Sequence, residues 1–85
     1  MSKAITIRYF ASIRETMGCS TEQFTSNAST LGELRAELVA RGNPSAECLG
    51  PGKAVRMAIN QVMGDDATLL QPTAEVAFFP PVTGG

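Results

Sequence analysis

The sequence predicts an α+β domain in which one main helix packs across one face of a mixed β-sheet. Three observations predict this fold class. Residues 4–10 alternate between apolar and polar side chains, as half-buried strands do. Residues 31–41 follow a capping signal and carry apolar side chains at helical spacing, and residues 75–79 form a short, mostly apolar run. With 85 residues, the chain is expected to form one domain around one apolar core.

The first strand is predicted from an alternation with a period of two. Ile5, Ile7 and Tyr9 fall on one face of this strand, and Thr6 and Arg8 fall on the other. This pattern is typical of an edge or hairpin strand that has one side against a core.

A short helix and a second strand are predicted next. Residues 11–17 place Ile13 and Met17 on one helical face, and Gly18 provides a stop. Residues 20–25 are polar but rich in Thr, which favours a strand antiparallel to the first.

The main helix is predicted from about Leu31 to Arg41. Thr30 and Glu33 form a capping box, in which each side chain bonds a free backbone donor of the first turn. The expected buried stripe consists of three leucines, Leu31, Leu34 and Leu38.

The end of this helix and the following loop are also predicted. Glu37 and Arg41 are expected to pair at i, i+4 on the exposed side, and residues 42–44, Gly-Asn-Pro, end the helix. Residues 45–53, which contain Gly-Pro-Gly, are predicted to be a loop.

Two further strands complete the expected sheet. Residues 55–59 alternate and end at a turn formed by residues 60–61, and residues 75–79 form the last strand. We expect the first and last strands to lie side by side in the middle of the sheet, which accounts for the continuous apolar run of residues 76–79.

The sequence divides into a folded body, residues 1–79, and an extended tail, residues 80–85. Pro80 and Pro81 lack amide donors, so they end the sheet ladder and direct the chain outward. At roughly 3.3 Å per residue, the tail reaches about 20 Å, enough to enter the active site of another protein. Gly84 and Gly85 make its end thin and flexible, although a Gly-Gly pair alone is a modest signal.

The terminal carboxylate of such a tail needs activation before it reacts. Its pKa is about 3.5, so it is an anion at neutral pH and resists nucleophilic attack. Adenylation by ATP converts it into a mixed anhydride, which a sulfur donor attacks to leave a C-terminal thiocarboxylate. The chain is then the group acted upon, and other proteins supply the catalytic residues.

Composition excludes several other classes of function. The net charge is −1 and no basic run occurs, so nucleic acid is not an expected partner.

There is no signal peptide and no apolar stretch of about 20 residues, so we expect a cytoplasmic protein without membrane contact. With no His and only Cys19 and Cys48, no metal site is expected. Both thiols are expected to be reduced and partly buried, while the sequence leaves a disulfide between them open.

Three stretches of the chain resemble the family of small, sulfur-carrying subunits of molybdopterin synthase. The tail with its strand, residues 75–85, is the most specific of them. Residues 10–18 are similar to that family's first strand-to-helix passage, and residues 58–61 to its third strand and turn. Residues 71–74, Gln-Pro-Thr-Ala, depart from the acidic, Gly-containing turn often found there, but Pro fits such a corner.

The resemblance implies a ubiquitin-like β-grasp fold and a set of partners. These are an adenylyltransferase related to ubiquitin-activating enzymes, which uses ATP, a sulfur donor protein, and the large synthase subunit in a heterotetramer. No cofactor is bound by the carrier itself. The thiocarboxylate of each of two carriers supplies one dithiolene sulfur of molybdopterin, which is made from cyclic pyranopterin monophosphate.

The resemblance also implies roles for individual residues. Gly85 carries the sulfur and Gly84 gives steric access. The residues implied at partner interfaces are Phe10, Arg14, Met63, Phe79, Pro80, Pro81, Val82 and Thr83. From the residues alone, Phe10 and Phe79 fit core aromatics equally well, and Arg14 fits a solvated charge.

Two other functions stay open at this point. A sulfur carrier of thiamin thiazole biosynthesis shares the fold and the Gly-Gly end, but the length and the Phe-Phe-Pro-Pro segment favour the molybdopterin family. A ubiquitin-like modifier or interaction module uses a Gly-Gly end to form isopeptide bonds, and stable lysine conjugates would distinguish it.

Overall fold

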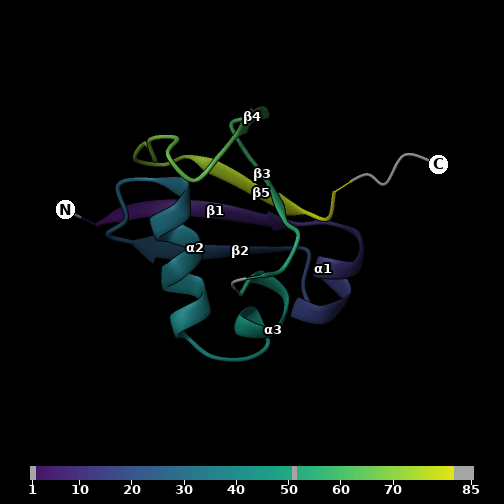
Figure 1. The fold of residues 1–85 in the computed structure, drawn as a ribbon. Helices are drawn as coiled ribbons and strands as arrows, with labels where there is room; N and C mark the ends of the chain where they lie inside the picture. Colours follow the sequence, from purple (N-terminus) through teal and green to yellow (C-terminus); the bar gives the residue numbers. More distant parts are fainter. Residues whose placement is uncertain (1, 51, 82–85) are drawn as a thin grey trace.

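The computed structural model describes residues 2–50 and 52–81. Within them, five strands and three helices follow one another along the chain (Figure 1). In chain order they are β1 (Lys3–Tyr9), α1 (Ala11–Met17), β2 (Thr21–Ser26), α2 (Leu31–Ala40), α3 (Ser45–Leu49), β3 (Arg56–Ile59), β4 (Val62–Gly64) and β5 (Glu75–Phe79).

The strands form one mixed sheet in the order β2-β1-β5-β3-β4. β1 and β5 pair in parallel, and the other neighbours pair antiparallel. The first and last strands therefore lie side by side in the interior of the sheet, as predicted. With α2 packed against it, this sheet has the predicted ubiquitin-like β-grasp arrangement.

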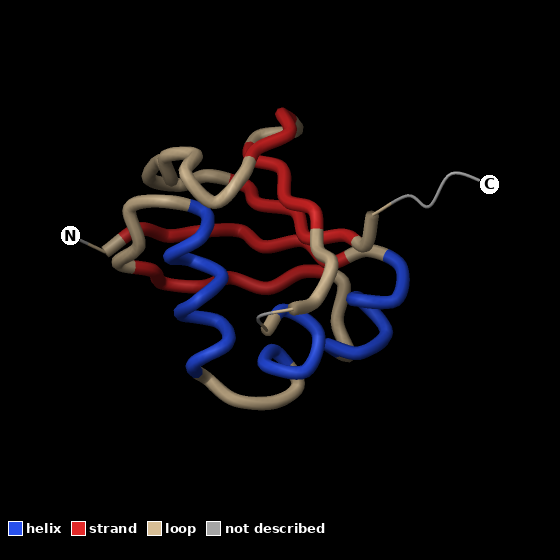
Figure 2. Tube along the Cα trace, viewed as in Figure 1, coloured by secondary structure: helices blue, strands red, loops and turns tan. Residues whose placement is uncertain are grey.

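All three helices bury side chains in the same core. Ile13 of α1, Leu34 of α2 and Leu49 of α3 join one cluster with strand residues such as Ile7 and Phe78. In Figure 2 the helices are gathered to one side of the strands. The opposite face of the sheet, which we call the open face, carries no helix within the described residues.

The prediction of a loop over residues 45–53 is wrong in its first half, because α3 lies there. This helix has five residues, little more than one turn, so it is too short to show a helical period in the sequence. Its Leu49 is fully buried, so packing on the core, rather than local propensity, stabilises it.

The cap and buried stripe of α2 are confirmed. The hydroxyl of Thr30 accepts a hydrogen bond from the backbone N–H of Glu33 at 3.2 Å, and the Glu33 carboxylate accepts one from the N–H of Ser29 at 2.7 Å. The three stripe leucines, Leu31, Leu34 and Leu38, are fully buried. Gly42, with φ of 89°, follows the end of the helix.

The predicted pair between Glu37 and Arg41 is wrong. Arg41 instead reaches the sheet, where its guanidinium donates to both carboxylate oxygens of Glu22 at 3.0 Å. The carboxylate of Glu37 accepts hydrogen bonds from the hydroxyl of Ser26 and from the backbone N–H of Asn27. Spacing within one helix could not indicate these partners, because both lie on other segments.

The predicted count of four strands is also wrong, since β4 adds a fifth. Asn60 and Gln61 form the predicted turn, and both have positive φ, 49° and 69°. Such turns match the twist of a hairpin, and the chain returns as β4 along β3. β4 has only three residues, Val62–Gly64, too few for a recognisable alternation.

The segment after β4 lies against the start of α2. The backbone N–H groups of Leu31 and Gly32 donate to the carbonyls of Thr68 and Asp66, at 2.9 and 3.0 Å. A Cβ at Gly32 would lie 2.9 Å from the Cβ of Asp66, so this approach requires glycine. These contacts position the segment that leads into β5.

The reason given for the apolar run of β5 is wrong. Val76 and Phe78 are fully buried, but Ala77 and Phe79 point to the open face and are only half-buried. A central strand in a sheet with helices on one side has one core face and one open face. Two apolar side chains of β5 are therefore left on the surface.

Candidate functional site

Two aromatic rings meet at the end of the open face. Phe10 follows β1 and Phe79 ends β5, and their ring centroids lie 6.5 Å apart in an edge-to-face arrangement. Phe10 is 41% exposed and Phe79 is half-buried, and neither belongs to the core cluster. The interpretation of these residues as core aromatics is therefore wrong.

The backbone around Phe10 holds its ring at this position. The N–H of Phe10 donates to the carbonyl of Phe78 at 3.2 Å, and the carbonyl of Phe10 accepts from the N–H groups of Ile13 and Arg14. Ala11 has a φ of 52°, a left-handed conformation that non-glycine residues adopt only when their surroundings require it. The turn from β1 into α1 thus fixes Phe10 beside β5.

A shallow hollow of about 510 Å³ lies around the two rings. Its lining residues are all apolar: Phe10, Ala11, Ala77, Phe79, Pro80 and Pro81. We call it the apolar hollow. A contiguous apolar surface at the exit of a chain segment is typical of a protein interaction site.

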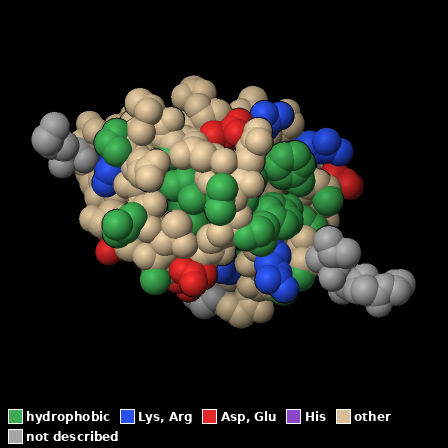
Figure 3. Space-filling view, turned by 90° about the horizontal axis from the view of Figure 1, so that it is seen from above, with side chains coloured by type: hydrophobic (Ala, Val, Ile, Leu, Met, Phe, Trp, Pro, Cys, Tyr) green, Lys and Arg blue, Asp and Glu red, His purple; other side chains and the backbone are tan. Residues whose placement is uncertain are grey.

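A basic side chain, Arg8, borders the apolar hollow. The guanidinium carbon of Arg8 lies 6.0 Å from the centroid of the Phe10 ring, and Arg8 also forms an ion pair with Glu75 at 3.2 Å. Arg14 is exposed on α1, one turn after Phe10. Figure 3 shows hydrophobic side chains gathered on one face of the molecule, with Lys or Arg side chains directly beside them.

Met63 extends this surface across the sheet. It is 57% exposed on β4 and pairs with Ala58 of β3, which in turn pairs with Ala77 of β5. Cross-strand partners share one face of a sheet, so these residues form a row that ends at the apolar hollow. The structure thus places Phe10, Met63 and Phe79 on one face.

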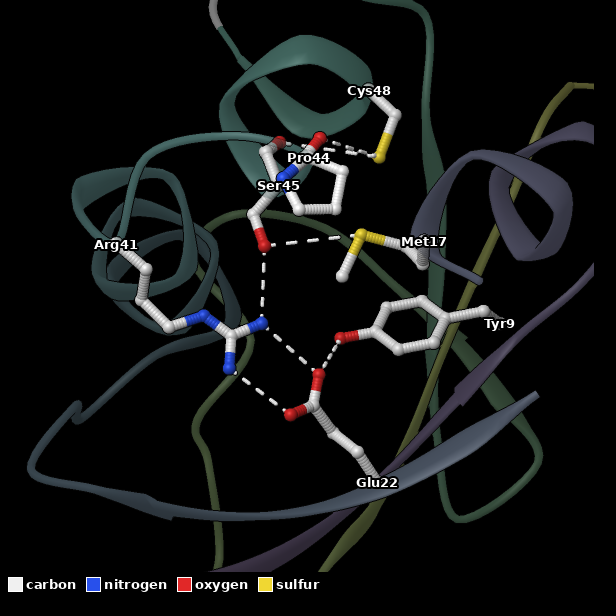
Figure 4. Close-up of polar contacts among 7 residues, drawn as sticks. All are labelled: Tyr9, Met17, Glu22, Arg41, Pro44, Ser45 and Cys48. Carbon is white, nitrogen blue, oxygen red and sulfur yellow. Dashed lines mark hydrogen bonds and ion pairs between the residues drawn. The ribbon is translucent and has the colours of Figure 1, made fainter. Parts of the chain in front are cut away.

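A polar network surrounds the hydroxyl of Tyr9, the residue before Phe10 (Figure 4). The hydroxyl of Tyr9 donates to the carboxylate of Glu22 at 2.6 Å, and Arg41 joins this carboxylate to the hydroxyl of Ser45 at 3.0 Å. The Ser45 hydroxyl lies 3.8 Å from the sulfur of Met17 on α1. The network links β1, β2, α1, α3 and the end of α2, so it joins the edge of the sheet to all three helices.

Burial and hydrogen bonding within the network shift the pKa values of Tyr9, Glu22 and Arg41. Hydrogen bonds from Arg41 hold the pKa of Glu22 below its usual value of 4.5. Burial, together with the hydrogen bond to the anionic Glu22, raises the pKa of Tyr9 well above its usual value of 10.0. Tyr9 is therefore a neutral hydrogen-bond donor at physiological pH, with a structural rather than a chemical role.

The end of β5 at Phe79 agrees with the predicted effect of the two prolines. Pro80 and Pro81 are half-buried and line the apolar hollow. The remaining predicted tail residues, Val82, Thr83, Gly84 and Gly85, lie outside the described residues. The described part of the tail thus begins within the candidate surface.

The described residues offer no metal site and no membrane-spanning helix. In residues 2–50 and 52–81, no group of three or more His, Cys, Asp or Glu side chains is arranged to hold a metal ion. Cys19 and Cys48 are free, half-buried thiols, as expected. Among the described helices, none has the length and apolar character needed to span a membrane.

Comparison with known proteins assigns the chain to a family. The model of the ThiS family matches residues 7–85. The chain belongs to the ThiS family. Two curated relatives, both named molybdopterin synthase sulfur carrier subunit, support the match. The one from Haemophilus influenzae is 35% identical and the one from Escherichia coli is 36% identical, each over 95% of this chain and 99% of the relative.

The fold of this ThiS-family chain is also similar to a solved structure. It is the protein–protein complex of subunit 1 and 2 of molybdopterin-converting factor from Helicobacter pylori, with a TM-score of 0.64 and 31% identity. The match covers 100% of both chains. The predicted resemblance and the predicted fold class are thereby confirmed.

Sequence reasoning missed part of this ThiS-family surface. Arg8, Ala11 and Ala77 were not singled out, yet each borders or lines the apolar hollow. The alternation within β5 was the available signal, because burial of Val76 and Phe78 turns Ala77 and Phe79 to the other face. Arg14, by contrast, was named, and it is exposed on α1.

Proposed function

We propose that this chain is the sulfur-carrier subunit of a molybdopterin synthase. The observation that carries the proposal is the match to two sulfur-carrier subunits of that enzyme, at 35% and 36% identity over nearly the whole of each chain. The apolar hollow beside Pro80 and Pro81 supports it, because a carrier needs a docking surface next to the segment that it presents.

The proposed chemistry takes place on the carboxylate of Gly85. A carboxylate oxygen attacks the α-phosphorus of ATP, pyrophosphate leaves, and an acyl adenylate forms. A sulfur donor at the oxidation level of hydrosulfide then attacks the acyl carbon, AMP leaves, and a thiocarboxylate remains. An adenylyltransferase catalyses the first step, and a donor protein supplies the sulfur of the second. Gly84 keeps the end of the chain narrow enough to enter these active sites.

The thiocarboxylate delivers its sulfur in the active site of the large synthase subunit. There its sulfur bonds to a side-chain carbon of cyclic pyranopterin monophosphate, and the oxygen on that carbon leaves as water. Hydrolysis of the resulting thioester leaves the sulfur on the pterin and returns Gly85 to a carboxylate. Two carriers supply the two dithiolene sulfurs, in keeping with a heterotetramer of two small and two large subunits. The Helicobacter pylori complex of subunits 1 and 2 supports a large-subunit partner for this chain.

The open face is the proposed docking surface for the large subunit. Phe10, Phe79 and Met63 form its apolar part, and Pro80 and Pro81 lead from it into the segment that carries Gly85. Free Cys19 and Cys48 fit a reducing compartment that also holds ATP, so we propose a cytoplasmic location.

The test is intact mass spectrometry of the full chain. The protein is incubated with the adenylyltransferase encoded in the same genome, ATP and a sulfur donor. The expected result is replacement of one oxygen by sulfur, and the product with ATP omitted is the control. The carrier role would be refuted if the mass of the chain stays unchanged while the adenylyltransferase is shown to be active on another carrier protein.

A second step separates the possible acceptors. The thiocarboxylated chain is mixed with the large synthase subunit and cyclic pyranopterin monophosphate, and the dithiolene product is measured. Sulfur transfer only to a thiazole synthase system would indicate the thiamin pathway instead. Isopeptide conjugates to lysines of other proteins would indicate a modifier.

A further inference from the structure

Arg56 lies next to the aromatic pair formed by Phe10 and Phe79. It is the first residue of β3 and pairs in register with Phe79 of β5, whose ring contacts Phe10 on the other side. Side chains of directly opposed residues lie on the same face with Cβ atoms about 5 Å apart. Arg56 is therefore the neighbour of Phe79 on the open face, one strand away from the residues that line the apolar hollow.

Arg56 forms no ion pair with another described residue. Two ion pairs occur within the described part of the chain, and Arg56, which is exposed, belongs to neither. Asp65 and Asp66 share a small hollow with it. However, the carboxylate of Asp65 accepts hydrogen bonds from the N–H of Ala67 at 2.9 Å and the hydroxyl of Thr68 at 3.3 Å, within its own loop.

We propose that Arg56 determines partner specificity in docking, by binding a carboxylate on the large synthase subunit beside the site that receives Phe79. This inference rests on the proposed function and adds the charge that the partner surface must carry. Docking on the two rings excludes water next to Arg56, so an unmatched cation there loses hydration without compensation. A guanidinium forms paired hydrogen bonds with a carboxylate, which makes an acidic side chain the matching group.

Another explanation for Arg56 is protection against aggregation. β4 pairs only with residues 57–59, so Arg56 stands where the outer edge of β3 is no longer covered. Charged residues at such edges discourage pairing with another chain. This explanation predicts that loss of the charge causes self-association and leaves partner binding unchanged.

The experiment measures binding of the full chain to the large subunit encoded in the same genome. Association rate and affinity are determined by surface plasmon resonance at low and high salt for the wild type, Arg56→Gln and Arg56→Lys. Ala36→Glu is the matched control. Like Arg56→Gln, it makes the net charge more negative by one unit, but Ala36 is exposed on α2, on the helix side of the sheet. Light scattering of each variant measures self-association.

Arg56→Gln is expected to weaken binding about threefold to fivefold at low salt, mainly through the association rate, with a smaller difference at high salt. Arg56→Lys keeps most of the association rate, and Ala36→Glu binds like the wild type. The inference is overturned if Arg56→Gln binds like the wild type, if it only self-associates, or if Ala36→Glu weakens binding equally. A wild type that does not bind the large subunit overturns the proposed function, and this inference with it.

Discussion

The ring of Phe10 meets the ring of Phe79 edge to face, at an interplanar angle of 84°. The two residues come from opposite ends of the chain and are brought together by the parallel pairing of β1 with β5. Neither ring belongs to the core cluster, so the pair forms a rigid apolar feature on the surface. Aromatic anchors of this kind often contribute most of the binding energy at protein interfaces.

Truncation of either ring is expected to weaken docking far more than folding. Phe10→Ala and Phe79→Ala should each reduce affinity for the large subunit at least about tenfold, because each removes an anchor from the apolar hollow. Phe10→Ala should change the free energy of unfolding by less than about 1 kcal/mol, since its ring is 41% exposed. Calorimetric binding and denaturant unfolding check the two effects. Leu69→Ala, at a position 71% exposed on another segment, is the control and should bind normally.

Removal of Gly85 is expected to abolish thiocarboxylate formation and leave the fold intact. The core cluster of the described residues lies between Ile5 and Phe78, so the unfolding midpoint should match that of the wild type. Mass spectrometry after incubation with ATP, adenylyltransferase and sulfur donor measures the first effect. A truncated chain that still transfers sulfur to the pterin precursor would disprove the role of Gly85.

Acid should destabilise the fold through Glu22. The folded state holds the pKa of Glu22 below 4.5, so the unfolded chain binds this proton more readily. The stabilising contribution is fully present above about pH 4.5 and is lost as pH falls through the lowered folded-state pKa. Glu22→Gln should therefore reduce stability at neutral pH and flatten the pH dependence in this range, as measured by urea unfolding. Glu47→Gln, which removes an exposed carboxylate, should leave the slope unchanged.

Loss of the Tyr9 hydroxyl tests the same network without changing its charge. Tyr9→Phe removes the donor to Glu22 and should reduce the free energy of unfolding by about 1.5 to 3 kcal/mol, as for a hydrogen bond to a charged group. Urea unfolding at neutral pH provides the measurement. Stability equal to that of the wild type would show that water replaces the hydroxyl.

Gly32 should be intolerant of alanine although it lies in a helix. Alanine normally favours a helix over glycine by about 1 kcal/mol, but a Cβ here would lie 2.9 Å from Asp66 Cβ and 3.0 Å from its carbonyl oxygen. Gly32→Ala should therefore lower the thermal midpoint. The converse change at an exposed position of the same helix, Ala36→Gly, should lower stability only by the propensity difference. A higher midpoint for Gly32→Ala would contradict the close contact.

The sequence by itself determined the features that depend on local chemistry. The alternation of Ile5, Ile7 and Tyr9, the cap at Thr30 and the stop at Pro80 each follow from side chains acting on their own segment, so these predictions hold in the structure. The resemblance of residues 75–85 then led to the family.

Tertiary structure decided the features that join distant segments. α3 and β4 are too short for their own periodicity and are stabilised by packing on neighbouring elements. Arg41 binds Glu22 rather than Glu37 because the sheet places a carboxylate within its reach. The apolar hollow exists because the helices cover one face only, which leaves Phe79 on the open face beside Phe10. Each of these contacts joins segments far apart in the chain, and no local pattern of residues encodes such a pairing.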